Sequence, residues 1–387
     1  MKRSTERILV THAGSLPRPD DLRALLAAKM AGGPVDEAAI AARVPGAVAE
    51  VVCQQAASGV DVANDGELSK TNFLFYVRER LGGTEVRPPQ VQGSATAGIS
   101  GRDARDFPEY FAEDTGRRQI GATLAGKRVF AVEPLRYVGQ AGVQADIANF
   151  KAALQAVQVE EAFLPAVAPG SIEHWLGNAY YPTEEAFLYG IAEAMHDEYQ
   201  AIVDAGFVLQ IDDPGMADSW QMHPDMSVAA YRKLAELHVN ALNHALRGIP
   251  ADRVRFHMCW GSYHGPHKHD IPLRDIVDLI LKVNAEAYSL EASNAAHEHE
   301  WQVWEDVKLP DGKILIPGVA GHSCDFVEHP ELVAERLVRY AKLVGRENVM
   351  AGTDCGLGER VGHPSLVWAK FQAMAEGARL ATRELWG

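Results

Sequence analysis

Short apolar runs rich in β-branched residues alternate along this chain with longer amphipathic segments. Apolar runs of strand length are typical of parallel strands that helices cover on both faces. The sequence predicts nine candidate strands, at residues 8–12, 60–65, 128–134, 162–169, 207–212, 254–259, 287–293, 314–320 and 348–355. The segments between them, such as 183–206 and 330–345, have helical spacing and end in glycine, as helices often do.

Strands that alternate with helices over this length form either a doubly wound sheet or an eight-stranded barrel. The glycine pattern of dinucleotide-binding sheets is absent after the first predicted strand. Polar residues end nearly every strand, as in THAGS, NDGE, QIDD, HMC, LEAS, AGHS and TDCG. A barrel gathers those ends around one mouth, whereas an open sheet spreads them along an edge. We therefore predict an α/β fold of the (β/α)8 TIM barrel type.

Nine candidate strands exceed the eight of a barrel, so one of them must lie outside it. Residues 82–140 are the least regular part of the chain and begin with a stretch rich in glycine, proline and serine. We assign the strand at 128–134 to an irregular excursion within this region. No linker or repeat divides the chain, which predicts a single barrel domain over residues 1–387.

Composition narrows the function classes. The chain has 47% hydrophobic residues, and 37 basic against 52 acidic residues leave a net charge of -15, which argues against binding to nucleic acid. Neither a membrane-spanning stretch nor a signal-peptide core is visible, so we expect a cytoplasmic protein without a membrane partner. The four cysteines are too few and too scattered for a disulfide framework. Of these, Cys53 lies in a helical pattern, and we expect it to be a small buried residue.

The stretch HMCWGSYHGPHKH, residues 257–269, carries the first sign of metal chemistry. Side chains alternate along a strand, so His257 and Cys259 point to the same side, which at a barrel strand's end is the mouth. Glu291 and Cys355 occupy equivalent places on two later strands. One imidazole, two thiolates and a carboxylate suit tetrahedral zinc, and two thiolates disfavour magnesium or calcium.

The other histidines of this stretch, His264, His267 and His269, lie among Gly261, Gly265 and Pro266 and therefore belong to a loop. Loop residues have few geometric constraints. We expect these three side chains to be solvated or structural, and not to bind the metal.

Taken together, the motifs resemble the catalytic C-terminal barrel of cobalamin-independent methionine synthase and its single-barrel relatives. In that family the histidine and cysteine of an HxC strand, a glutamate on the next strand and the cysteine of a DCG turn bind the catalytic zinc. The resemblance covers essentially the whole chain. It implies a catalytic Zn2+ with His257, Cys259, Glu291 and Cys355 as ligands.

Further motifs match in the same order. The resemblance implies that Ala13 and Ser15, in HAGSLPRP, hold the carboxylate of an amino-acid thiol. It implies that Glu67, in DGE, and Asp212, in QIDDP, receive the ammonium group of that thiol. It also implies that His322, in GVAGHS, donates a proton near the leaving group.

The second substrate is less defined by the resemblance. Trp175, in PGSIEHW, matches the tryptophan against which a pterin lies. The long N-terminal half of the full-length synthases is absent, and residues 82–127 replace the family's basic segment between the second and third strands. The alkyl donor therefore stays open between a methylfolate and a methylcorrinoid.

The resulting hypothesis is a zinc-dependent S-methyltransferase of methionine biosynthesis that acts on homocysteine or a related thiol. Its partners are then a small-molecule thiol and an alkyl donor, with homo-oligomerisation left open. The alternative is an epoxide:coenzyme M transferase, in which Arg18 and Arg136 face a sulfonate. A zinc hydrolase ranks behind both, because two thiolates reduce the Lewis acidity of the metal. Zinc as a structural staple also ranks behind them, because a barrel of this length has no need of one.

Overall fold

A curled sheet of parallel strands forms the centre of the computed structural model, which describes residues 1–30, 33, 35–87, 101–112, 128–358 and 360–387. Its strands follow the order β1-β4-β6-β7-β8-β9-β10. Their bounds are β1 Val62–Ala63, β4 Glu161–Val167, β6 Val208–Asp212, β7 Val254–Met258, β8 Ala287–Glu291, β9 Ile314–Ala320 and β10 Gly352–Thr353. Every residue of β6, β7, β8 and β9 is buried, as expected for strands that helices cover.

The first predicted strand, residues 8–12, lies between β10 and β1. Val10 forms a parallel bridge with Ala351, and the Thr11 amide donates to the Ala351 carbonyl at 2.8 Å. On the other side, the Val62 amide donates to the Val10 carbonyl at 3.0 Å. These bonds join the two ends of the sheet and supply the eighth barrel strand, which confirms the predicted fold class.

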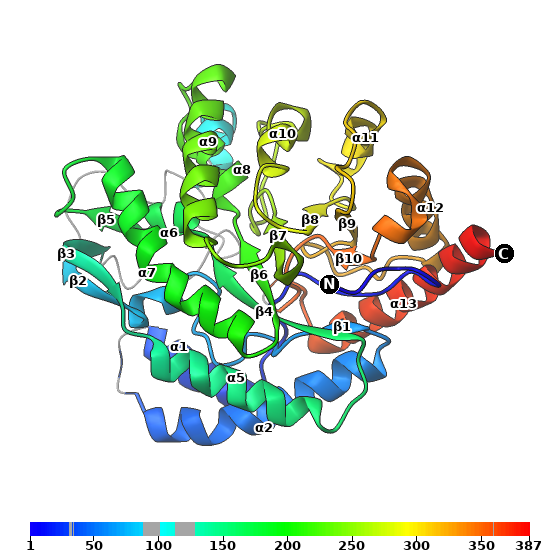
Figure 1. Cartoon of the computed structure of the whole chain (residues 1–387), viewed down its shortest axis with the longest axis horizontal. Helices are drawn as coiled ribbons and strands as arrows, with labels where there is room; N and C mark the ends of the chain where they lie inside the picture. The colour runs from blue at the N-terminus through cyan, green and yellow to red at the C-terminus, as the bar shows by residue number, and fades with distance from the viewer. Residues whose placement is uncertain (31–32, 34, 88–100, 113–127, 359) are drawn as a thin grey trace.

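Helices cover the outside of this sheet (Figure 1). The long ones are α1 Asp20–Met30, α2 Glu37–Ala57, α5 Gln140–Leu154, α7 Glu184–Asp204, α9 Val228–Ala245, α12 Pro330–Val344 and α13 Pro364–Trp386. The shorter helices are α3 Gly101–Asp106, α4 Pro108–Ala112, α6 Pro169–Glu173, α8 Gly215–Met222, α10 Val277–Ile280 and α11 Val303–Asp306. Short 3-10 turns are η1 Phe75–Glu79, η3 Ala251–Arg253, η4 Leu273–Asp275, η5 Glu298–Gln302 and η6 Arg346–Asn348. None of the described helices is long and apolar enough to cross a lipid bilayer.

Helix α12 shows how local sequence sets the ends of an element. The His329 side chain accepts a hydrogen bond from the Glu331 amide at 3.2 Å, and Pro330 occupies the first turn, where its missing N–H costs nothing. Leu337 lies on the buried face. Gly345 ends the helix with a φ of 93°, a conformation that glycine adopts without strain.

The predicted excursion forms a second, three-stranded sheet at one side of the barrel (Figure 1). Strand β2 (Leu81–Arg87) pairs antiparallel with β3 (Arg128–Tyr137), which confirms that the run at 128–134 lies outside the barrel. Residues 88–100 and 113–127 of this region lie outside the described residues. Strand β5 (Leu176–Asn178) completes the sheet beside β3. It was not predicted, because three residues carry no periodic pattern.

Two expectations differ from the structure. Strands β1 and β10 are two residues long, although runs at 60–65 and 348–355 were predicted. Before β10, Val349 and Ala351 form only isolated bridges, with Leu315 and Val10. The prediction that Cys53 is buried is wrong, since its side chain is exposed on α2. The buried face of α2 is formed by Val44, Val48 and Val51 instead, and Cys53 lies on the opposite side of the helix.

A buried arginine links the first barrel strand to the strand that carries the HMC motif. Arg255, on β7, donates to the Thr11 hydroxyl and to the His12 carbonyl, both at 2.9 Å. Its guanidinium also lies 4.2 Å from the ring centre of Phe163. This contact holds the loop after residue 12 near His257, two residues further along β7.

Candidate active site

Three of the four predicted metal ligands meet at the barrel mouth. His257 lies on β7, Cys259 follows that strand and Cys355 follows β10. One potential ligand atom from each of them lies within 4.8 Å of the other two. The backbone geometry explains this grouping, because alternate residues of β7 point to the same side and the carboxyl ends of parallel strands share one rim.

The ring of His257 is oriented by a second residue. Its Nδ1 lies 3.2 Å from the Ser289 hydroxyl, on the neighbouring strand β8. Its Nε2 is buried and has no hydrogen-bond partner among the described residues. Histidine ligands of metals usually show this arrangement, in which one ring nitrogen is hydrogen-bonded to a neighbour and the other is available for the metal.

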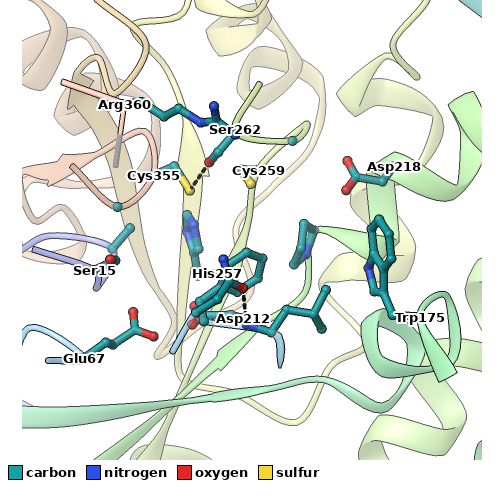
Figure 2. Close-up of a pocket in the computed structure, with 17 residues that line it drawn as sticks. Ser15, Glu67, Trp175, Asp212, Asp218, His257, Cys259, Ser262, Cys355 and Arg360 are labelled. Carbon is teal, nitrogen blue, oxygen red and sulfur yellow. Dashed lines mark hydrogen bonds between the residues drawn. The ribbon is translucent and has the colours of Figure 1, made fainter. Parts of the chain in front are cut away.

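The two thiols influence each other strongly. The pKa of Cys355 is held well below its usual range, first by the Cys259 thiol and then by His257. The pKa of Cys259 is raised well above its usual range by Cys355 and by burial. The Ser262 hydroxyl lies 2.9 Å from the Cys355 sulfur (Figure 2). Two sulfurs this close cannot both ionise unless a cation lies with them, so the donor set fits a thiophilic metal such as zinc.

Glu291, the fourth predicted ligand, lies next to these residues in a second group. Its carboxylate accepts hydrogen bonds from the Trp260 amide and the Asn294 side chain, both at 2.8 Å. Potential ligand atoms of Glu291, His322 and Asp354 all lie within 4.8 Å of one another. The negative charge of Glu291 also contributes to the raised pKa of Cys259.

His322 follows β9 and is almost completely buried. Neither ring nitrogen has a hydrogen-bond partner among the described residues. The ring lies close enough for its charge to lower the pKa of Cys355. Burial without hydrogen bonds is unusual for an imidazole and is more typical of a functional group than of a structural one.

The predicted thiol-binding residues line one pocket together with His257, Cys259 and Cys355, the three potential metal ligands. This pocket encloses about 840 Å3, its open mouth included. Its wall contains Ala13, Ser15, Glu67, Asp212 and Trp175. In Figure 2, Ser15 and Glu67 lie on one side of the two sulfurs, and Trp175 lies on the other.

Glu67 has an unusual backbone conformation. Its φ is 57°, and the Arg18 side chain donates to its carbonyl at 2.9 Å. The Lys70 ammonium lies 3.7 Å from its carboxylate. A β-carbon on residue 14 would lie 2.7 Å from Glu67 Oε1, so only glycine at that position lets the carboxylate approach the loop of Ala13.

Asp212 carries the second carboxylate of the pocket. Burial, and then the charge of Glu67, raise its pKa to about 8. The Gln210 amide donates to Asp212 at 2.7 Å and to the Ala13 carbonyl at 2.5 Å. The adjacent Asp213 is not among the residues that line the pocket, and it accepts a hydrogen bond from the Ser171 hydroxyl at 2.7 Å.

Asp218, which was not predicted as a site residue, also lines the pocket, on the same side as Trp175 (Figure 2). One of its carboxylate oxygens is buried without a hydrogen-bond partner among the described residues. Burial and the charge of Asp270 raise its pKa well above the usual range. Its position in GMADSW, on the short helix α8 that follows the QIDDP strand end, is the only sequence signal for it.

Of the loop histidines, His267 lies outside the group of His257, Cys259 and Cys355 and forms a separate group with Asp270 and His297, whose potential ligand atoms lie within 4.8 Å of one another. His267 lies 2.7 Å from Asp270, and His297 lies 3.0 Å from the same carboxylate oxygen. The second nitrogen of His267 faces the Tyr263 carbonyl at 3.2 Å, and that of His297 faces Glu300 at 3.0 Å. Each ring nitrogen thus faces an acceptor, an arrangement that favours the imidazolium form and raises the pKa of both rings.

Comparison with known proteins supports the same interpretation. Residues 178–379 match the family described as cobalamin-independent synthase, catalytic domain. A methionine synthase of Sulfurisphaera tokodaii is 23% identical over 376 residues, which cover 97% of this chain and 93% of the relative. One of Thermococcus kodakarensis is 24% identical over 85% of this chain and 80% of its own.

Solved structures show the same fold. A B12-independent methionine synthase from Shewanella sp. W3-18-1, in complex with selenomethionine, superposes with a TM-score of 0.74 at 18% identity. The superposition covers 98% of this chain and 99% of the other. At this identity the similarity concerns the fold alone.

Proposed function

Because the chain belongs to the cobalamin-independent methionine synthase family and is a methionine-synthase-like methyltransferase, we propose that it methylates the thiol of homocysteine, or of a close relative, at a zinc ion. The observation that carries this proposal is the content of one pocket. Two carboxylates, Glu67 and Asp212, line the same cavity as the thiols of Cys259 and Cys355. A substrate that carries an ammonium group and a thiol matches this lining, because the ammonium group pairs with the carboxylates and the thiol lies beside the two cysteines.

The residues present fit a zinc ion. His257, Cys259 and Cys355 would hold it, and the uncommitted Nε2 of His257 is the nitrogen available for this purpose. Zinc in this site supplies a Lewis acid that lowers the pKa of a bound thiol while leaving its sulfur nucleophilic.

Glu291 would be the fourth residue to hold the metal, and its carboxylate is the ligand that a substrate thiol would most readily replace. An oxygen donor is the least suited of the four to a thiolate-rich site, so it is the one most easily replaced. The contacts of Glu291 with the Trp260 amide and with Asn294 support this role, because they keep the carboxylate beside the site after it has left.

The pocket orients the thiol through its other functional groups. Glu67 and Asp212 would receive the ammonium group, and the Ser15 hydroxyl with the backbone of residues 13–15 would receive the carboxylate. Two carboxylates around one cation hold the substrate in a single orientation, which lowers the entropic cost of reaching a reactive geometry. The raised pKa of Asp212 in the absence of a cation supports this assignment.

The methyl donor is proposed to lie on the side of Trp175 and Asp218. Trp175 offers a flat apolar surface, and the buried oxygen of Asp218 offers an acceptor for an N–H group of the donor. His322 is proposed to supply the proton that the leaving group requires. A protonated imidazole at this position stabilises a poor leaving group by general acid catalysis.

The test is a set of assays with zinc-loaded protein. Homocysteine or coenzyme M is offered with a methylfolate, a methylcorrinoid or epoxypropane, and loss of free thiol is measured. We expect methionine from homocysteine and no consumption of coenzyme M. Consumption of coenzyme M with epoxypropane would overturn the proposal in favour of the epoxide transferase.

The expected preference has a structural basis. Among the described pocket-lining residues, Arg360 is the sole lysine or arginine. Arg18 donates to the backbone of Glu67, and Arg136 lies exposed on β3 beside Glu133. Neither lines the pocket, whereas the carboxylates of Glu67, Asp212 and Asp218 do, and these would repel a sulfonate.

A further inference from the structure

A second cavity lies directly beside the substrate pocket, and we call it the side cavity. It encloses about 330 Å3, its mouth included, and shares Leu74 and Trp175 with the main pocket. It is formed where η1, β2, β3 and β5 meet the segment around α6, at the side of the barrel that carries the small sheet (Figure 1). Its remaining apolar wall consists of Phe75, Val77, Leu81, Val129, Ile172 and Leu176.

One charged side chain, Arg78, lines this apolar cavity. Its guanidinium lies over the ring of Phe75, 4.1 Å from the ring centre. In the described part of the chain, no carboxylate and no hydrogen-bond acceptor contacts it. Burial lowers the pKa of Arg78 to about 10. Partial removal of a cation from water without a counter-ion costs free energy, which a bound anion would recover.

The neighbouring Arg80 shows what a satisfied buried arginine looks like in this region. It forms ion pairs with Asp146 and, at 3.1 Å, with Glu198. Glu198 also accepts hydrogen bonds from Tyr76 and Tyr137, both at 2.7 Å. Arg80 thus serves the packing of the small sheet on the barrel, whereas Arg78, two residues earlier, has no such structural role.

We propose that the side cavity is a subsite for a carboxylate carried on a flat apolar stem, with Arg78 as its counter-ion. One guanidinium balances one negative charge, and the apolar walls disfavour a strongly hydrated dianion such as phosphate. Trp175 and Leu74 line both cavities, so a compound whose reacting group lies beside the sulfurs would reach Arg78 past these two side chains. The stem stacks on Trp175, which makes T-shaped contact with Phe75 at 5.6 Å.

The assignment of this compound to the methyl donor rests on the proposed function, but the subsite itself does not. Binding can therefore be measured without turnover. The probes are 4-phenylbutyrate and its uncharged counterpart 4-phenylbutyramide, which share one stem. Calorimetric titration of the zinc-loaded protein is expected to show at least about tenfold tighter binding of the carboxylate, the usual gain from a charged hydrogen bond.

Substitutions of Arg78 test whether this side chain causes the preference for the carboxylate probe. Arg78→Gln is expected to abolish the preference for the carboxylate, and Arg78→Lys to keep part of it. Arg136→Gln removes the same charge from an exposed position on β3 and is expected to change nothing. Arg78→Gln loses no hydrogen bond of the described structure, so its fold, checked by circular dichroism, should be intact.

The proposal is overturned if wild-type protein binds both probes equally or binds neither. It is also overturned if Arg78→Gln, shown to be folded, retains the full wild-type preference for the carboxylate. Failure of the methyl-transfer assays with all donors would instead contradict the proposed function and leave the probe binding unaffected.

Discussion

The carboxylates of Glu67 and Asp212 line one pocket although 144 positions separate them in the sequence, and the charge of Glu67 contributes to the raised pKa of Asp212. Two buried carboxylates in one cavity are costly unless a cation joins them. The Lys70 ammonium lies 3.7 Å from the Glu67 carboxylate. The pKa of Asp212 is raised to about 8 in spite of this lysine, and a substrate ammonium group would supply the positive charge that favours the ionised form.

Loss of either carboxylate should therefore weaken the binding of an amino-acid thiol. For Asp212→Asn and Glu67→Gln, we expect the KM for homocysteine to rise by about 10- to 100-fold, because a charged hydrogen bond to the ammonium group is lost. The control substrate is 4-mercaptobutyrate, which lacks the amino group. Its KM should change little, and an equal loss for both thiols would contradict the assignment.

Removal of a thiol ligand should release the metal without unfolding the barrel. Cys259→Ser and Cys355→Ser are expected to lower the zinc content from about one ion per chain to well below half, and to abolish methyl transfer. Elemental analysis and circular dichroism measure the two effects. Cys53→Ser, on the exposed face of α2, is the matched control and should keep full zinc. A full zinc content in both ligand variants would exclude this site.

Glu291 should exchange with the substrate sulfur. X-ray absorption at the zinc edge is expected to show one oxygen ligand replaced by sulfur when homocysteine is added to the wild-type protein. In Glu291→Gln the oxygen donor is weaker, so the spectrum without thiol should differ from that of wild type and the spectrum with thiol should match it. Identical zinc ligation with and without thiol would count against the exchange.

His322 should affect catalysis more than binding. His322→Gln is expected to lower kcat by about 100-fold or more, the usual contribution of a general acid. The KM for the thiol and the zinc content should stay near those of wild type, because the ring makes no hydrogen bond with the described residues. An unchanged kcat, measured with the chemical step rate-limiting, would rule out the proton-donor role.

The network of His267, His297 and Asp270 should make stability depend on pH. Burial opposes the charged rings, but hydrogen bonds to Asp270 raise the pKa of His267 to about 9 and that of His297 to about 10. Because these pKa values lie above that of an unfolded histidine, near 6.5, the stabilisation is fully present below pH ~6.5 and is lost as the pH rises through ~9 to ~10.

The variant His297→Gln tests this network. Denaturant unfolding near pH 6.5 should show a free energy of unfolding lower than that of wild type by about 2 to 4 kcal/mol. The difference should shrink toward pH 10. His269→Gln is a control, since that ring is partly exposed and pairs with Asp106 at the surface. A difference that stays constant from pH 6 to pH 10 would show that the two rings are not charged.

Much of the fold could be predicted from the sequence because strand and helix patterns are local. The apolar runs at 207–212, 254–259 and 314–320 are buried strands, and the run at 128–134 lies outside the barrel as predicted. The exposed position of Cys53 and the short strand β5 were not predictable. Burial of a small residue on a helix depends on which face packs, and a three-residue strand exists only because β3 lies beside it.

The candidate site, like the fold, was determined in part by local sequence and in part by the tertiary structure. The sequence by itself determined the donor types and their places at strand ends, since alternation along a strand puts His257 and Cys259 on one side. Only the tertiary structure decided that Glu291 lies with His322 and Asp354, that Asp218 lines the pocket and that Arg78 has no counter-ion among the described residues. These properties depend on distances and burial between segments far apart in the chain, which no local pattern of residues records.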